Sequence, residues 1–123
     1  MAAPNVVNVT TITGKTAVLA VTTTATAIVT NSSGSNKVFK INSLVVSNVD
    51  GTNAADITVS LYSEDNIGGT ATEIVSTVSV PADASLVVID KNTSIYLEED
   101  KSIGATAGSA SDLKVVCSYE EIS

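Results

Sequence analysis

The 123-residue sequence contains no histidine, arginine, tryptophan or glutamine. It therefore lacks the commonest general base, the usual catalytic triads, imidazole metal ligands and the guanidinium fork that binds phosphate. The ionisable side chains that remain are mainly 13 Asp and Glu residues and 6 lysines. We expect a protein that is not an enzyme and that holds no cofactor and no tightly bound metal.

Cysteine and aromatic residues are also scarce, with one Cys, one Phe and three Tyr. The single thiol, Cys117, cannot form an internal disulfide, and it lies in LKVVCSYEEI on the same strand face as Leu113, Val115 and Tyr119. We predict that it is buried and acts as a small hydrophobic residue. With so few aromatic rings, valine, alanine, isoleucine and leucine must fill the core.

The charge and the apolar runs exclude two classes of partner. A net charge of −7 repels the phosphate backbone, so we expect no nucleic-acid binding. The longest strictly apolar run is AVLAV, far short of the roughly 18 residues that span a membrane. The N-terminal MAAPNVVNVT lacks the basic and apolar regions of a secretory signal, so synthesis in a cytoplasm is expected.

The surface is expected to be unusually apolar. Only 15% of residues are charged, and the mean hydropathy is +0.34, which is high for a chain that stays soluble alone. This indicates that other subunits cover part of the surface.

Short alternating segments predict β-strands. ADITVSLY alternates strictly, with Ile57, Val59 and Leu61 on one face. KVFKINSLVVSN predicts a longer strand with Phe39 and Ile41 inward, and its LVV triplet indicates either two-sided burial or a bulge that changes phase. Between these strands, VDGTNA is typical of a hairpin centred on Asp-Gly.

The same rhythm continues to the end of the chain, with strand-like segments every 8 to 12 residues separated by turn residues. We predict an all-β fold, an antiparallel β-sandwich that is jelly-roll-like or Ig-like, with short connecting loops and no substantial helix. The residues predicted to lie in or beside the core are Ile57, Val59, Leu61, Val78, Val80, Leu86, Val88, Leu97, Val115 and Cys117.

The N-terminal region has high β-propensity but poor alternation, and we predict short strands at VVNVTTI, TAVLAV and TAIVT. Residues 1–13 are interpreted as an arm and residues 14–123 as a single sandwich domain. The arm has too little apolar surface to fold alone, but it can add a strand to a neighbour's exposed sheet edge. Its expected assembly contacts are Val6, Val7, Val9 and Ile12.

Several acids could in principle form a site. Paired carboxylates can hydrolyse glycosides, and the candidates are Asp90, Glu98, Glu99, Asp100, Glu120 and Glu121. We favour turn residues instead for Asp83, in PADA, and for the acids 98–100, which lie where one strand must reverse into the next.

The loop NVDGTNAAD offers a second possible site, because its side-chain oxygens are of the kind that calcium prefers. The candidate ligands there are Asp50, Asn53 and Asp56. The loop lacks the acid spacing and the terminal Glu of an EF-hand, so a plain Asp-Gly hairpin is favoured over a metal site.

Three stretches carry a family resemblance: KVFKINSLVVSNVDGTNAADITVSLY, VSVPADASLVVIDKNTSIYLEEDKSI and the terminal LKVVCSYEEI. Over residues 37–123 the chain resembles small virion structural proteins of tailed phages, particularly of the marine cyanophage type. Such proteins often have Gly after the two Glu, where this chain has Asp100. The resemblance implies a β-sandwich module without catalytic residues, present in many copies on the particle.

The expected function is therefore structural, in a virion assembled from protein made in the host cytoplasm. The first hypothesis is a capsid decoration (cement) protein, a homotrimer that bridges and stabilises capsomers of the major capsid protein. The alternative is a neck, tail or fibre-base component. A receptor- or carbohydrate-binding module is a third hypothesis, and the scarcity of aromatic residues counts against it.

Overall fold

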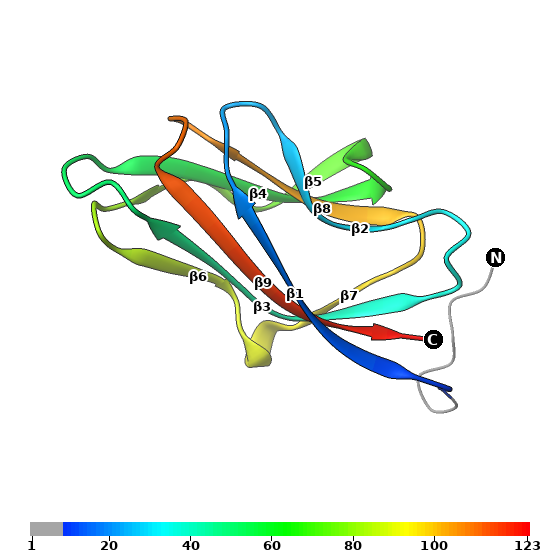
Figure 1. Ribbon diagram of the computed structural model, residues 1–123. Coiled ribbons are helices and arrows are strands. Elements are labelled where there is room, and N and C mark those ends of the chain that lie inside the picture. The colour runs from blue at the N-terminus through cyan, green and yellow to red at the C-terminus, as the bar shows by residue number, and fades with distance from the viewer. Residues whose placement is uncertain (1–8) are drawn as a thin grey trace.

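The computed structural model describes residues 9–123, and most of this range is β-strand (Figure 1). The strands in chain order are β1 (Ile12–Ala20), β2 (Thr26–Asn31), β3 (Val38–Asn48), β4 (Ala55–Glu64), β5 (Gly68–Val80), β6 (Ser85–Ile89), β7 (Ile95–Leu97), β8 (Lys101–Ala107) and β9 (Leu113–Ile122). The helical structure in the described range is one 3₁₀ turn, η1 (Lys91–Thr93). No helix in the same range is long and apolar enough to cross a membrane.

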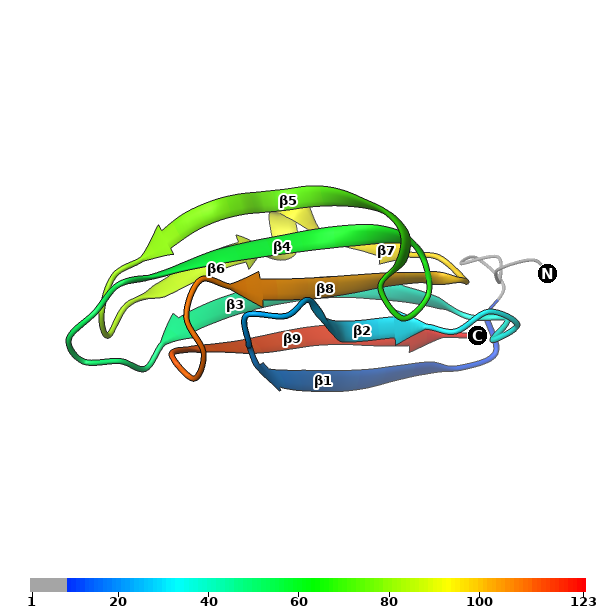
Figure 2. The same ribbon diagram turned by 90° about the horizontal axis from the view of Figure 1, so that it is seen from above.

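The strands form two antiparallel sheets that pack as a sandwich (Figure 2). Sheet A has the order β1-β9-β3-β6, with β7 also paired to β3, and sheet B has the order β2-β8-β4-β5. Consecutive strands mostly alternate between the sheets, and the first and last strands are neighbours. This is the jelly-roll arrangement, one of the two topologies that the strand pattern allowed. The predicted all-β antiparallel sandwich is confirmed.

The core between the sheets is built from small and medium aliphatic side chains, as the scarcity of aromatic residues requires. All ten residues predicted to be in or beside the core are found there. Those that are fully buried are Ile57, Val59, Val80, Leu97, Val115 and Cys117. Those that are partly buried and pack against the core are Leu61, Val78, Leu86 and Val88.

Strand β3 contains a bulge, which is one of the two alternatives that its LVV triplet had left open. Phe39 and Ile41 are buried toward the core as predicted, and the pairing with β9 then shifts between Ile41 and Ser43. After the shift, Leu44 and Val46 point inward and Val45 points outward. The extra residue changes the phase, so both ends of one long strand present apolar side chains to the same core.

The hairpin predicted at Asp50-Gly51 is wrong, because β3 belongs to sheet A and β4 to sheet B. The segment is a connection that crosses between the sheets. Asn48, buried at the end of β3, sets this path by donating through Nδ2 to the carbonyls of Asn53 and Val80, both at 2.9 Å. Asn31 ends β2 in the same way, with Nδ2 bound to the carbonyls of Lys37 and Leu97.

At the N-terminal side, the described chain begins just before β1. Val9, Thr10 and Thr11 are not in a strand, so the strand predicted over residues 6–12 is wrong for residues 9–11, and β1 starts at Ile12. The amides of Thr10 and Thr11 donate to the carbonyl of Ser123, at 2.6 and 3.0 Å. The division of the chain at residue 13 stays a prediction.

The turn acids adopt conformations that suit short polar residues. Asp83 has φ 57° and Asp100 has φ 62°, the left-handed region that glycine, asparagine and aspartate tolerate best. The resembling proteins often have Gly at the position of Asp100. Asp100 therefore occupies a turn position with a backbone geometry that glycine adopts easily. Asp90 caps η1, where its side chain accepts from the amides of Asn92 and Thr93.

Candidate functional site

The carboxylates considered for catalysis hold loops in place. At the end of the sandwich where β7 leads into β8, Glu99 Oε2 accepts from the Asn36 amide at 3.4 Å, and Asp100 Oδ1 accepts from the Asp65 amide at 3.2 Å. Asp65 Oδ2 in turn accepts from the Ser33 amide at 2.9 Å. These bonds tie three loops together, which agrees with the interpretation of the acids as turn residues.

The other candidate carboxylates are distributed along the fold. Asp90 is the η1 cap, Glu98 is exposed directly after β7, and Glu120 lies on β9 beside Lys40 of β3. In the part of the chain that the structure describes, no group of three acidic or cysteine side chains is placed to share a metal ion.

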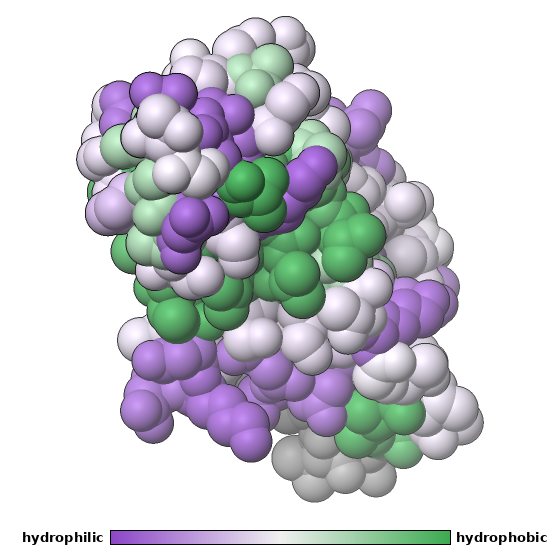
Figure 3. Space-filling view, turned by 60° about the vertical axis from the view of Figure 1, so that its left-hand side comes forward, coloured by the Kyte–Doolittle hydropathy of each residue, from purple (hydrophilic) through white to green (hydrophobic). Residues whose placement is uncertain are grey.

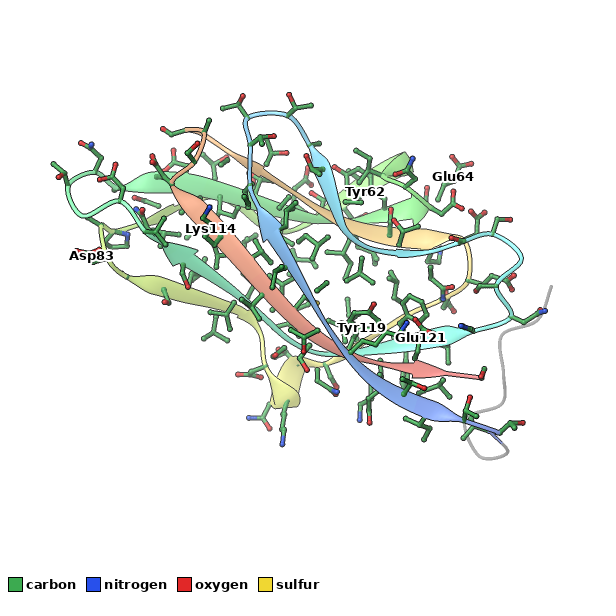
Figure 4. All side chains as sticks on the ribbon, in the orientation of Figure 1. Tyr62, Glu64, Asp83, Lys114, Tyr119 and Glu121 are labelled. Carbon is green, nitrogen blue, oxygen red and sulfur yellow. The ribbon has the colours of Figure 1, made fainter. Side chains whose placement is uncertain are left out.

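Glu121 is the most strongly paired carboxylate in the described fold. It accepts from Lys37 Nζ at 2.7 Å and lies 2.9 Å from Lys15 Nζ, although these lysines come from distant parts of the sequence. The hydrogen bond from Lys37, followed by that from Lys15, lowers the pKa of Glu121, and the same contact raises the pKa of Lys15. Figure 4 places Glu121 and Tyr119 toward the end where β9 finishes.

Apolar contacts accompany this ion pair. The rings of Phe39 and Tyr119 pack with their centroids 5.2 Å apart, and burial raises the pKa of Tyr119. Two residues earlier on β9, burial raises the pKa of Cys117 to about 11, so the thiol stays protonated at neutral pH. The predicted burial of Cys117 is confirmed.

We expect the Glu121 pairs to stabilise the fold in a pH-dependent way. Because the pKa of Glu121 in the folded state lies below its ordinary value of 4.5, the stabilisation is present above pH 4.5 and is lost as the pH falls through the folded pKa. In urea unfolding, Glu121→Gln should have a lower free energy of unfolding than wild type at pH 7. This difference between the two proteins, the stability gap, should be smaller at pH 3. Glu120→Gln, the adjacent carboxylate, is the control. An equal gap at both pH values would show that the charge is irrelevant.

The loop considered as a calcium site is organised by its own backbone. Asp50 Oδ1 accepts from the amides of Thr52 and Asn53, at 2.8 and 3.3 Å. These bonds, led by the one from Thr52, lower the pKa of Asp50. Asp56, the third proposed ligand, is exposed on β4. The arrangement is that of an Asx turn, which uses the carboxylate to shape the crossing between the sheets.

Two of the four residues expected to make the assembly contacts of the arm lie within the described residues. Val6 and Val7 lie outside the described residues. Val9 is half-buried, and Ile12 is 56% exposed at the start of β1, opposite Ile122 of β9. Their role in assembly stays a prediction.

The outer face of sheet A carries an apolar feature that the sequence analysis did not identify. Val18 pairs with Val116, Val116 with Val45, and Val45 with Val87, so one valine from each of the strands β1, β9, β3 and β6 falls in a single line across the sheet. We call these four residues the valine row. Val18, Val116 and Val87 are 73%, 45% and 58% exposed, and Val45 is half-buried.

Polar residues border the valine row. On one side, a hollow of about 540 Å³ is lined by Lys40, Asn42, Ser43, Lys91, Ser118 and Glu120. It lies where the β3 bulge interrupts the pairing with β9. Figure 3 views this side of the molecule and shows hydrophobic side chains gathered in a band between hydrophilic groups. Apolar side chains so exposed across a whole sheet are typical of a surface that another protein covers.

Comparison with known proteins finds similarity at the level of the fold. No protein-family model matches the chain, and no curated protein matches its sequence. A solved structure of Bacillus endospore appendages, described as disulfide-linked pili, is 19% identical with a TM-score of 0.53, covering 92% of this chain and 88% of that chain. The acid-stable capsid of Helicobacter pylori bacteriophage KHP30 is 12% identical with a TM-score of 0.50, covering 94% and 90%.

A pentameric capsid protein from metagenomic phage sequences is 18% identical with a TM-score of 0.42, covering 87% of this chain and 62% of that chain. At these identities the similarity concerns the fold alone. The chain thus has a sandwich fold like those in solved structures of a phage capsid and of pili.

Proposed function

We propose that this chain is a non-enzymatic structural protein of a bacteriophage particle, and specifically a decoration (cement) protein that stabilises the capsomers of the major capsid protein. The observation that carries the proposal is the jelly-roll sandwich, which aligns along nearly its whole length with a structure from a phage capsid. The acids that tie loops together and the exposed valine row support a role in assembly in place of catalysis.

The arm fits this role. Val6, Val7, Val9 and Ile12 would contact a neighbouring subunit by adding backbone to an exposed sheet edge, in a homotrimer or on the capsid lattice. Of these residues, Ile12 already presents more than half of its surface to solvent.

A second candidate is a subunit of a filament, such as a tail or fibre-base component. It is favoured by the fold similarity to the disulfide-linked pili of Bacillus endospore appendages. A covalent link of that kind through Cys117 is not expected in this chain, because its single thiol is buried in the core.

Copy number in purified particles tests these alternatives. Quantitative mass spectrometry against the major capsid protein should find hundreds of copies per particle for a decoration protein, and labelled antibodies should bind over the whole head in electron micrographs. A few copies, with label confined to the neck or tail, would support the filament candidate. Absence from purified particles would contradict both.

A further inference from the structure

Charges of opposite sign flank the valine row at the two ends of the sheet, in one order at β6 and β3 and in the reverse order on β9. Val87 lies on β6, with Asp83 four residues earlier in the chain and Lys91 four residues later. Asp83 lies in the turn before β6 and Lys91 in η1 after it, so the two charges lie beyond opposite ends of the strand that carries Val87.

Strand β3 repeats the pattern. Lys40 lies five residues before Val45 and Asp50 five residues after it. Since β3 and β6 are antiparallel, both lysines fall at one end of sheet A and both acids at the other. The two acids are close in space, because the Asp83 amide donates to the Asp50 carbonyl at 3.1 Å, and both lysines line the same hollow.

Strand β9 also carries a lysine and an acid, but at the opposite ends of the sheet from those at β3 and β6. Lys114 lies two residues before Val116 and Glu120 four residues after it. Lys114 is therefore at the end of the sheet that carries the acids, and Glu120 is at the end that carries the lysines. In Figure 4, Asp83 and Lys114 lie toward one end of the sandwich.

A pattern of this kind complements a copy of itself. If two copies pack these faces together about a two-fold axis parallel to the valine row, the two rows coincide and the ends of each sheet exchange places. The Asp50 and Asp83 end of one copy then meets the hollow with Lys40 and Lys91 in the other, and the same contact forms twice.

The area is sufficient for such a contact. Four strands about 4.8 Å apart give a width of roughly 19 Å, and the face is roughly 34 Å long at β1, β9 and β3 and about half as long at the shorter β6. Covering it would bury an area on the order of the roughly 800 Å² per partner found in stable interfaces. Aligned packing of two sheets is also a common geometry.

We propose that the outer face of sheet A is a self-association surface, on which a second copy of this chain packs its own valine row, with the strands of the two facing sheets antiparallel. The proposal rests on the face itself and not on the virion role proposed above. The contact is distinct from any that the arm makes.

Sedimentation velocity of the full chain at several concentrations tests the apolar centre. Wild type should form dimers, and Val87→Glu should weaken dimerisation at least tenfold. Ile74→Glu is the matched control, because Ile74 is an exposed apolar residue on β5 of the other sheet and its substitution should leave the dimer unchanged. Circular dichroism and thermal melting check that each variant folds.

A charge exchange tests the orientation. Asp83→Lys and Lys91→Glu should each weaken the dimer, and the double variant should restore it, because the exchanged charges again face each other across the two-fold axis. Both side chains are at the surface, so each variant is expected to fold.

A wild-type chain that stays monomeric at about 100 µM, far above the micromolar range of a modest interface, would overturn the proposal. An oligomer that Val87→Glu leaves intact would also overturn it and would assign assembly to another surface. Failure of the double variant to recover would refute the antiparallel arrangement. None of these results depends on copy number in particles, so they are separable from the test of the proposed function.

Discussion

Replacing Leu44 with alanine is expected to lower the free energy of unfolding by about 2–5 kcal/mol. Leu44 is fully buried on β3, which pairs with β9, β6 and β7 and is therefore the central strand of sheet A. Its paired residues, Cys117 and Ile89, are buried as well, so the deleted atoms would leave a cavity with rigid strands on both sides. Small domains have a total stability of about 5–15 kcal/mol, so the loss is a large fraction.

Leu61→Ala is the matched control, because it deletes the same atoms from a side chain that is only partly buried. Urea unfolding followed by circular dichroism should show a clearly smaller loss for Leu61→Ala than for Leu44→Ala. Equal losses would mean that the phase of β3 after its bulge is assigned incorrectly.

Asn48→Asp is expected to cost about 2–4 kcal/mol at pH 7, although the two side chains have nearly the same shape. The amide nitrogen of Asn48 donates to the carbonyls of Asn53 and Val80, and its Oδ1 accepts from the Asp50 amide at 2.9 Å. A carboxylate has no proton for the two carbonyls, and it would bring a charge into a site that is only 3% exposed. The connection between the two sheets would then lose its anchor.

The size of this defect should depend on pH. Burial beside two carbonyl oxygens would raise the pKa of the new carboxyl above its unfolded value, so the destabilisation is largest above that raised pKa and shrinks as the acid is protonated. Urea unfolding at pH 7 and pH 3 measures this, with Asn92→Asp on the exposed η1 turn as control. A defect of the same size at both pH values would indicate steric disruption instead of lost donors.

Strand positions and the inward face of each strand were predictable from local patterns. The alternation of Ile57, Val59 and Leu61 reports which face is buried, because successive side chains in a strand point to opposite sides. The turn acids were predictable for a similar reason, since short polar side chains satisfy their own backbone. The bulge in β3 was one of two alternatives, and the packing of Leu44 and Val46 against the opposite sheet selected it.

The path of the chain between strands was not predictable in the same way. An Asp-Gly pair between two strands favours a hairpin locally, yet here the segment crosses from sheet A to sheet B. The deciding contact joins Asn48 to Val80, 32 residues away, and a local pattern carries no information about it.

By itself, the sequence determined an all-β sandwich with an aliphatic core, because strand periodicity and composition are properties of short segments. Only the tertiary structure decided which residues share a surface. Val18, Val45, Val87 and Val116 form one row, and Glu121 meets Lys15 and Lys37, through the register of strands that are distant in the chain. Register is set by the packing of all the strands together, and a shift of one residue would move every one of these side chains to the opposite face.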